Sequence, residues 1–294
     1  MRIFKNLLLS MAVVSCLTGC GTLRPYVMNQ TADALSGQAS DDENDLQLAK
    51  DASAFYLKFS ESVLREVPEH QGLRAALAAG YTQYAFAFVS FEAEQMEHRD
   101  REKAAQLRER AGKLYARAHA HAMRALKASY PRIEEALQTP DASQWPELSV
   151  AQVRLVYWAS ASLGGWISMS KDSPEAVANL PLAHRLAEWA WRVDPGFQQG
   201  ALSSLMATYE TARIGGSTDK AASFIDQAIQ ASGGESAGPW VTQAEVLAVA
   251  QHDKEMFTHS LKQACEIATA RPSLSNEVMC VRARWLLTQM DELF

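Results

Sequence analysis

The side chains that could bind a metal ion or transfer protons lie at spacings that disfavour both kinds of chemistry. His119 and His121 are two residues apart on a predicted helix, where such positions diverge by about 200° and do not share a metal ion. No phosphate loop, His-Glu-Xaa-Xaa-His or Cys-Xaa-Xaa-Cys motif occurs. We therefore expect no catalytic site, no metal site and no cofactor. A mixed polar run is interpreted as a solvated helix face rather than an acid–base set: Glu92, Glu94, Glu97 and His98.

One arginine stands out because Arg154 lies within one helical turn of Tyr157 and Trp158 on the most apolar predicted helix. A guanidinium in an aromatic cleft can hold a ligand carboxylate, whereas an arginine at the edge of a core stacks on the rings or extends to solvent. Both interpretations stay open. The glycine-rich run at 215–220 lacks the spacing of a phosphate loop, and we expect a turn between two helices with Ser217 as the N-cap.

The N-terminus carries the clearest chemical signal. Arg2 and Lys5 precede an apolar stretch that is too short to span a bilayer, so residues 1–19 are predicted to be a signal peptide. Leu17-Thr18-Gly19-Cys20 resembles the bacterial lipobox, in which the cysteine thiol receives a diacylglycerol. Cys20 is thus the expected lipidation site, and an unmodified cysteine after an ordinary signal sequence is the alternative. Gly21 stands where aspartate would retain the lipoprotein at the inner membrane, so the resemblance favours the periplasmic face of the outer membrane.

The charge of the mature chain does not favour binding to anionic surfaces. Removing residues 1–19 takes away two of the 28 basic residues and none of the 34 acidic ones, so the formal charge changes from −6 to −8. Nucleic acid is therefore not an expected partner, and membrane attachment must come from acyl chains at about 0.8 kcal/mol per buried methylene. Residues 20–44 are interpreted as a lipidated tether. As an alternative, this segment docks on the domain through Leu23, Tyr26, Val27 and Leu35.

The rest of the chain, residues 45–294, repeats apolar residues at helical spacing and predicts an all-α domain. The first helix is expected to bury Leu48, Ala52, Phe55, Phe59, Val63 and Val67, and the second an aromatic stripe of Tyr81, Tyr84, Phe88 and Phe91. A third helix covers about 101–130, and Pro131 after it can only open a fourth. A fifth covers about 149–170, where Gly164 and Gly165 indicate close packing or a kink.

The C-terminal half reads as further helical hairpins. Asp219-Lys220 and Asp253-Lys254 begin two similar helices 34 residues apart, which is the tetratricopeptide period, although chance can explain one loose match. We expect a tetratricopeptide-like stack of antiparallel helix pairs, an α-solenoid with a concave binding face. Cys265 and Cys280 flank a helix break at 271–273, so a disulfide between them is predicted, with two free buried thiols as the alternative.

Several segments taken in series resemble the TatT family, tetratricopeptide-like lipoproteins of tripartite ATP-independent periplasmic (TRAP) transporters. These segments are 80–89, 110–118, Tyr157-Trp158 with Trp166-Ile167 and Lys171-Asp172, 193–200, and Gly215-Gly216 with Lys220-Ala221. The sequence departs from the family where Leu163 precedes Gly164-Gly165. The resemblance implies a pore-bearing, self-associating protein, a trimer, that cooperates with a periplasmic solute-binding protein to hand over an organic acid or apolar ligand without covalent chemistry. The lining residues mapped onto this sequence are Tyr84, Phe88, Arg154, Trp158 and Trp166.

A different class of function competes with this one. A tetratricopeptide lipoprotein can serve as a scaffold for envelope assembly and bind peptides instead of solutes. The transport hypothesis requires a deep apolar cleft, whereas the scaffold hypothesis requires an open groove lined by polar and small residues.

Overall fold

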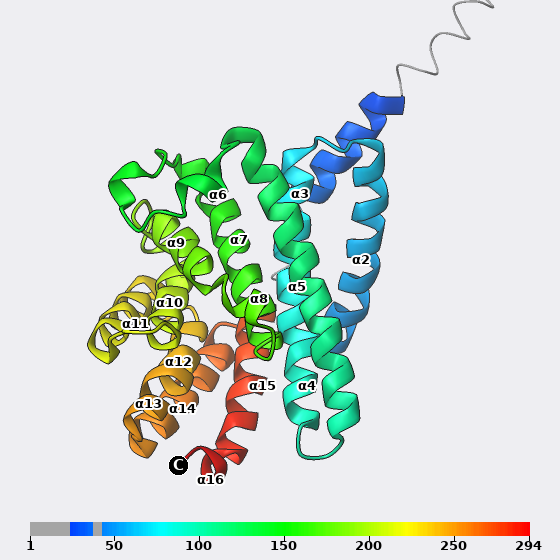
Figure 1. The fold of residues 1–294 in the computed structure, drawn as a ribbon. Coiled ribbons are helices and arrows are strands. Elements are labelled where there is room, and N and C mark those ends of the chain that lie inside the picture. Colours follow the sequence, from blue (N-terminus) through cyan, green and yellow to red (C-terminus); the bar gives the residue numbers. More distant parts are fainter. Residues whose placement is uncertain (1–23, 38–42) are drawn as a thin grey trace, which may run out of the picture.

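The structure is a computed structural model, and it describes residues 24–37 and 43–294. Within these ranges the regular structure is helical throughout (Figure 1). The prediction of an all-α fold is therefore confirmed. The expected signal peptide and Cys20 lie outside the described residues.

The N-terminal half is built from long helices. After a helix at 24–37 come α2 (Leu46–Glu66), α3 (Gln71–Tyr84), the π-helical segment η1 (Ala85–Ser90), α4 (Phe91–Met96), α5 (Arg101–Ser129), α6 (Ile133–Ala136), the 3-10 turn η2 (Ala142–Gln144) and α7 (Val150–Met169). The third and fifth predicted helices thus exist as α5 and α7. Their core is continuous from α3 through α5 to α7.

Shorter helices form the C-terminal half: α8 (Pro174–Val177), α9 (Leu180–Trp191), α10 (Phe197–Ala212), α11 (Thr218–Ser232), α12 (Gly238–Thr242), the π-helical η3 (Gln243–Ala248), α13 (Val249–Gln251), α14 (Lys254–Ala270), α15 (Leu274–Thr288) and α16 (Met290–Leu293). Neighbours in sequence pack as pairs, such as α10 with α11 and α14 with α15. Helix α15 of the last pair packs against α4 of the N-terminal half, where the rings of Phe91 and Trp285 lie 5.4 Å apart. An open α-solenoid is therefore not confirmed.

The expected tether contains an ordered helix. Residues 24–37 are helical, and Ala32 and Leu35 are buried against the domain. Asp33 pairs with His70 at 3.0 Å, and Arg24 with Glu66 at 2.7 Å. The structure thus follows the docking alternative, although through Leu35 and not through Tyr26 or Val27, which are 63% and 54% exposed. Leu23 lies outside the described residues.

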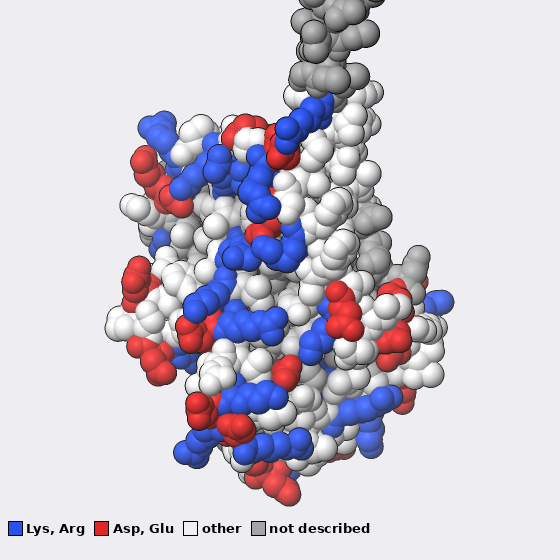
Figure 2. All heavy atoms as spheres, turned by 90° about the vertical axis from the view of Figure 1, so that its right-hand side faces the viewer, with Lys and Arg blue, Asp and Glu red and all other residues white. Residues whose placement is uncertain are grey.

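Helix α2 buries a different side from the one expected. Leu48, Phe55 and Phe59 were predicted to be core, yet they are 55%, 73% and 44% exposed. Val63 and Val67 are buried as predicted, and Leu57 and Leu64 take the core positions expected for the earlier residues. Because α2 is apolar on two sides, periodicity alone did not determine which side meets α3. The outer side leaves a band without charged residues that Figure 2 shows beside a column of lysine and arginine.

The structure also bears on two other expectations, the role of Gly164 and Gly165 and the 34-residue repeat. A Cβ atom on Gly165 would lie 2.5 Å from the ring of Tyr115, and one on Gly164 would lie 2.4 Å from the Tyr209 hydroxyl, so close packing explains both glycines. The 34-residue repeat is weaker than its spacing suggests. Ser217 caps α11 as predicted, two residues before Asp219, whereas Asp253 itself caps α14. The two helices therefore begin at different points of the apparent repeat.

Candidate functional site

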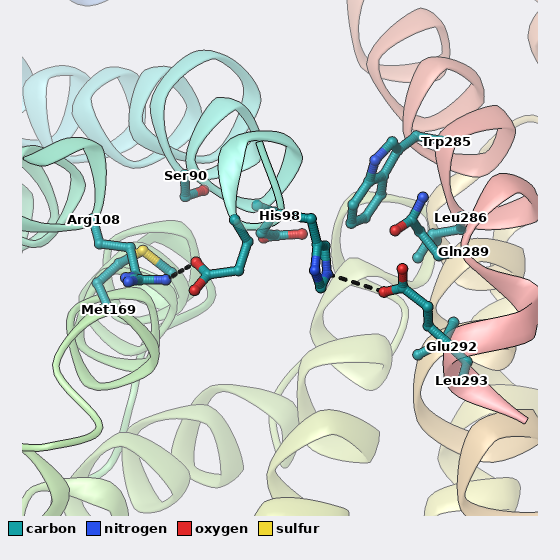
Figure 3. A pocket seen from close by; sticks show the side chains of 11 residues that line it. Ser90, His98, Arg108, Met169, Trp285, Leu286, Gln289, Glu292 and Leu293 are labelled. Atoms are coloured by element: carbon teal, nitrogen blue, oxygen red, sulfur yellow. Dashed lines mark hydrogen bonds and ion pairs between the residues drawn. The ribbon is translucent and has the colours of Figure 1, made fainter. Parts of the chain in front are cut away.

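A pocket of about 310 Å³ lies where the C-terminal helices meet the N-terminal half. Such a volume is at the lower end of the range for small-molecule sites, about 300–1,000 Å³. Its wall mixes apolar and ionisable side chains: Ser90, Glu94, Glu97, His98, Arg108, Met169, Trp285, Leu286, Gln289, Glu292 and Leu293 (Figure 3). A second hollow of about 360 Å³ is bordered by residues of α14 alone, so it is a depression on one helix.

Two ion pairs lie among the residues that line the pocket (Figure 3). Glu97 pairs with Arg108 of α5, and His98 Nε2 lies 3.0 Å from Glu292 Oε2 on α16. Asp100 caps α5 through the backbone N–H of Lys103 and so fixes the turn that carries both pocket residues. Because the side chains of His98 and Glu292 are 65% and 57% exposed, their pairing stabilises the contact by at most about 1 kcal/mol. The apolar wall and the buried interactions beneath it must hold the two halves together.

The strongest of these buried interactions is centred on Arg282 of α15. Its Nε lies 3.1 Å from both carboxylate oxygens of Glu245, and its Nη2 lies 2.6 Å from Glu245 Oε1 and 2.9 Å from Glu94 Oε2. The guanidinium carbon is within 6 Å of the ring centres of Phe86, Phe91 and Trp285, at 5.6, 5.4 and 5.9 Å. Nη1 is buried and has no hydrogen-bond partner among the described residues. Glu94 joins this centre to the pocket, because it also lines the pocket wall.

Both π-helical segments contribute to the Arg282 centre. Segment η1 carries Phe86 and Ser90, and η3 carries Glu245. A π turn accommodates one extra residue and so rotates the side chains that follow relative to those before it. Tyr81, before η1, stacks on His121 of α5, whereas Phe91, after it, meets Trp285 of α15. Such turns are often found at functional sites.

Burial and charge act in opposite directions on this centre. Burial raises the pKa of Glu94 above its ordinary value, and the attraction of Arg282 offsets only part of that effect. Burial alone lowers the pKa of Arg282, but the charges of Glu245 and Glu94 outweigh it and the pKa is raised. Tyr115, whose hydroxyl is 3.4 Å from Ser90 Oγ, has its pKa raised to about 12, chiefly by burial. Arg282 therefore stays cationic, and the raised pKa of Glu94 makes that carboxylate easier to protonate than an ordinary glutamate.

The five residues expected to line a cleft do not meet at this pocket. Tyr84 and Phe88 contact each other at 5.6 Å within the N-terminal core. Trp158 is 5% exposed in the neighbouring core, and Trp166 packs between the two. Arg154 is exposed near the start of α7, in line with the alternative that it extends to solvent. None of the five borders either hollow described above, because four of these side chains fill space between helices instead of enclosing it.

The sequence analysis does not predict the side chains that form the site. Glu94 was interpreted as part of a solvated face, which is wrong because it is paired with a buried arginine. The available signal was Arg282 itself, since it lies four residues from both Val278 and Leu286, on the buried side of α15. An arginine at such a position requires a carboxylate from another element.

Other chemical signals in the sequence lead to no site. His119 Nδ1 lies 2.9 Å from the Ala159 carbonyl oxygen, whereas His121 stacks on Tyr81, so the two histidines are not brought together. Residues 234–238 match the Gly-Xaa-Ser-Xaa-Gly spacing of a nucleophile elbow, which the sequence reasoning overlooked. That elbow requires a strand before the serine, whereas Ser236 here follows helix α11. In the described ranges there is also no cluster of three potential metal ligands.

Cys265 and Cys280 are joined by a disulfide across the α14–α15 hairpin, with their Cα atoms 4.6 Å apart. The bond ties the helix that carries Arg282 to its partner, two residues before the arginine. It therefore holds α15 in register at the level of the buried centre.

The chain is similar to known proteins over most of its length. Of the helices described, none combines the length and apolarity needed to cross a bilayer. The chain is 23% identical over 289 residues to a protein of Treponema pallidum (strain Nichols) described as uncharacterized, with 93% of this chain and 89% of that protein covered. Residues 42–294 match the model of the TAtT family, the TRAP transporter T-component. This match spans the domain that forms the pocket, so the chain belongs to the TRAP transporter T-component family.

Proposed function

We propose that the protein is a lipid-anchored periplasmic accessory subunit of a TRAP-type transport system that binds a small ligand and exchanges it with a periplasmic solute-binding protein. The pocket between the two halves of the chain is the observation that carries the proposal. It is concave, it has an apolar wall, and it lies within the region that matches the family. Binding and hand-over need no covalent chemistry, so the proposed role is non-catalytic.

The pocket wall favours an apolar ligand over an organic acid. Met169, Trp285, Leu286 and Leu293 supply apolar surface. The three carboxylates of the wall are already paired with Arg282, Arg108 and His98. A ligand carboxylate would have to compete with them for these cations, whereas an apolar group gains about 25 cal/mol per Å² of buried surface.

Three further elements of the proposal concern assembly. Acylation of Cys20 would anchor the chain, and Gly21 favours the outer membrane over the inner one. Self-association, as a trimer, is supported by the apolar outer side of α2, which nothing else in the described chain covers. Monomeric soluble proteins rarely expose large continuous apolar surfaces without a partner.

Native mass spectrometry of the mature protein, purified from its membrane with and without a candidate solute-binding protein, tests the function. We expect a retained small molecule that is lost from Trp285→Ala but kept in Trp240→Ala, which alters a tryptophan outside the pocket. Equal retention in both variants would place the ligand elsewhere. A peptide in place of a small molecule would favour the scaffold hypothesis.

A further inference from the structure

The start of the N-terminal helix has two properties that do not serve the domain itself. In its first turn, residues 24–27 are all exposed, and Tyr26 and Val27 present apolar side chains at 63% and 54% exposure. From Met28 onward the helix packs on the domain. It is held in place by the pairs that Arg24 forms with Glu66 and Asp33 with His70. The buried Ala32 and Leu35 fix the helix on the domain, and its exposed first turn extends beyond them.

The distance from this turn to the proposed anchor is short. Four peptide steps separate Cys20 from Arg24, and a fully extended chain covers at most about 3.6 Å per residue, or roughly 14 Å. The headgroup layer on each side of a bilayer is about 5–8 Å thick. The acylated cysteine lies at the inner edge of that layer, so the helix starts at most about 9 Å above its outer edge. The domain cannot move far from the membrane on a connection of this length.

We infer that the domain stands on the lipid surface on the first turn of its N-terminal helix, with Tyr26 and Val27 in the headgroup layer and the pocket at the opposite end. This inference rests on the proposed lipidation of Cys20. Tyrosine is enriched at membrane interfaces because its ring is apolar and its hydroxyl is polar.

Helix α5 gives the distance between the two ends. Near its C-terminus Arg124 pairs with Glu69, three residues from the Glu66 that pairs with Arg24, and near its N-terminus Arg108 lines the pocket. Their separation of 16 residues in sequence corresponds to about 24 Å along the helix axis. Figure 1 shows the N-terminal helix at one end of the molecule and α16 at the other. The pocket is thus held away from the lipid, where a water-soluble partner can reach it.

Depth-dependent fluorescence quenching tests this orientation. The natural cysteines leave no free thiol in the mature lipoprotein, since Cys16 is removed with the signal peptide, Cys20 is acylated and the other two are bonded. Val27→Cys and Arg99→Cys would each add one exposed thiol, at the lipid end and the pocket end, for an environment-sensitive label. The lipidated protein is placed in phosphatidylcholine and phosphatidylglycerol vesicles with brominated acyl chains.

We expect the label at position 27 to lose fluorescence in these vesicles and the label at position 99 to keep it, because only position 27 lies within the headgroup layer, next to the brominated chains. Equal quenching at the two positions, weak or strong, would overturn the inference. So would a label at 27 that is shielded from both lipid and water, because a second copy would then cover it. Flotation with the vesicles is scored separately. A protein that fails to float refutes the lipid anchor, whereas one that floats without quenching at position 27 refutes only the orientation.

Discussion

Replacing Arg282 tests whether the buried centre holds the two halves of the protein together. In Arg282→Met the carboxylates of Glu94 and Glu245 lose their shared cation, while a side chain of similar volume still fills the space between the aromatic rings. Removing one member of a buried ion pair costs about 3–5 kcal/mol. The two glutamate side chains are 34% and 30% exposed and can regain some water, so we expect about 3 kcal/mol, at the low end of that range.

Thermal unfolding followed by circular dichroism at neutral pH measures this loss. For a chain of this size 1 kcal/mol corresponds to about 2–4 °C in Tm, so Arg282→Met should unfold roughly 6–12 °C below the wild type. The matched control is Arg284→Met, two residues further along α15, where the side chain is exposed. Arg282→Lys should give an intermediate loss, because lysine keeps the charge but not the bidentate contact with Glu245.

A rescue variant separates lost attraction from lost packing. Adding Glu94→Gln and Glu245→Gln to Arg282→Met removes both uncompensated charges and should restore more than half of the lost stability. If Arg282→Met unfolds within about 1 °C of Arg284→Met, less than 0.5 kcal/mol on the same scale, the centre does not join the two halves and the reasoning fails.

Three further predictions concern pH, backbone conformation and assembly. The raised pKa of Glu94 means that its contribution to stability is present at acidic pH and lost as pH rises through the folded-state pKa. In urea titrations, Glu94→Gln should therefore become more stable relative to the wild type as the pH rises from 4.5 to 8. A stability difference that does not change with pH would argue against burial as the cause of the raised pKa. Gly200 has a φ of +88°, and a Cβ there would lie 2.3 Å from the Ala228 carbonyl oxygen, so Gly200→Ala should cost about 2 kcal/mol or more; an unchanged Tm would contradict the close approach. Phe55→Ser with Phe59→Ser should weaken self-association at least tenfold in sedimentation equilibrium, with the exposed Val150→Ser as control; an unchanged distribution would exclude the outer side of α2.

The sequence predicted the helices far better than the contacts between them. α5 and α7 were found within a residue or two because their apolar spacing, caps and bounding prolines are local signals. The aromatic stripe of the second helix was predicted on one face, and Tyr81, Tyr84 and Phe91 are indeed buried. A π turn between them, which no simple spacing rule anticipates, then directs Phe91 toward α15.

The pocket and the Arg282 centre beneath it could not be predicted because the pocket residues alone come from four separate stretches of the chain. Arg282 and Glu245 are 37 residues apart and Glu94 is much further away, so no local pattern connects them. The aromatic residues that resemblance suggested as a lining, Trp158 and Tyr84, are used as core. Aromatic residues at helical spacing serve either purpose, and only the packing of neighbouring helices decides between them.

The sequence by itself predicted the all-α class, the bounds of α5 and α7, the pairing of Cys265 with Cys280 and the family, because each depends on spacing along one chain. The tertiary structure decided which side of α2 is exposed, that residues 24–37 belong to the domain, and that the C-terminal hairpin closes against α4. The physical reason is that burial depends on all the surfaces competing for the same core. An arginine or an aromatic stripe acquires its role only when those surfaces meet.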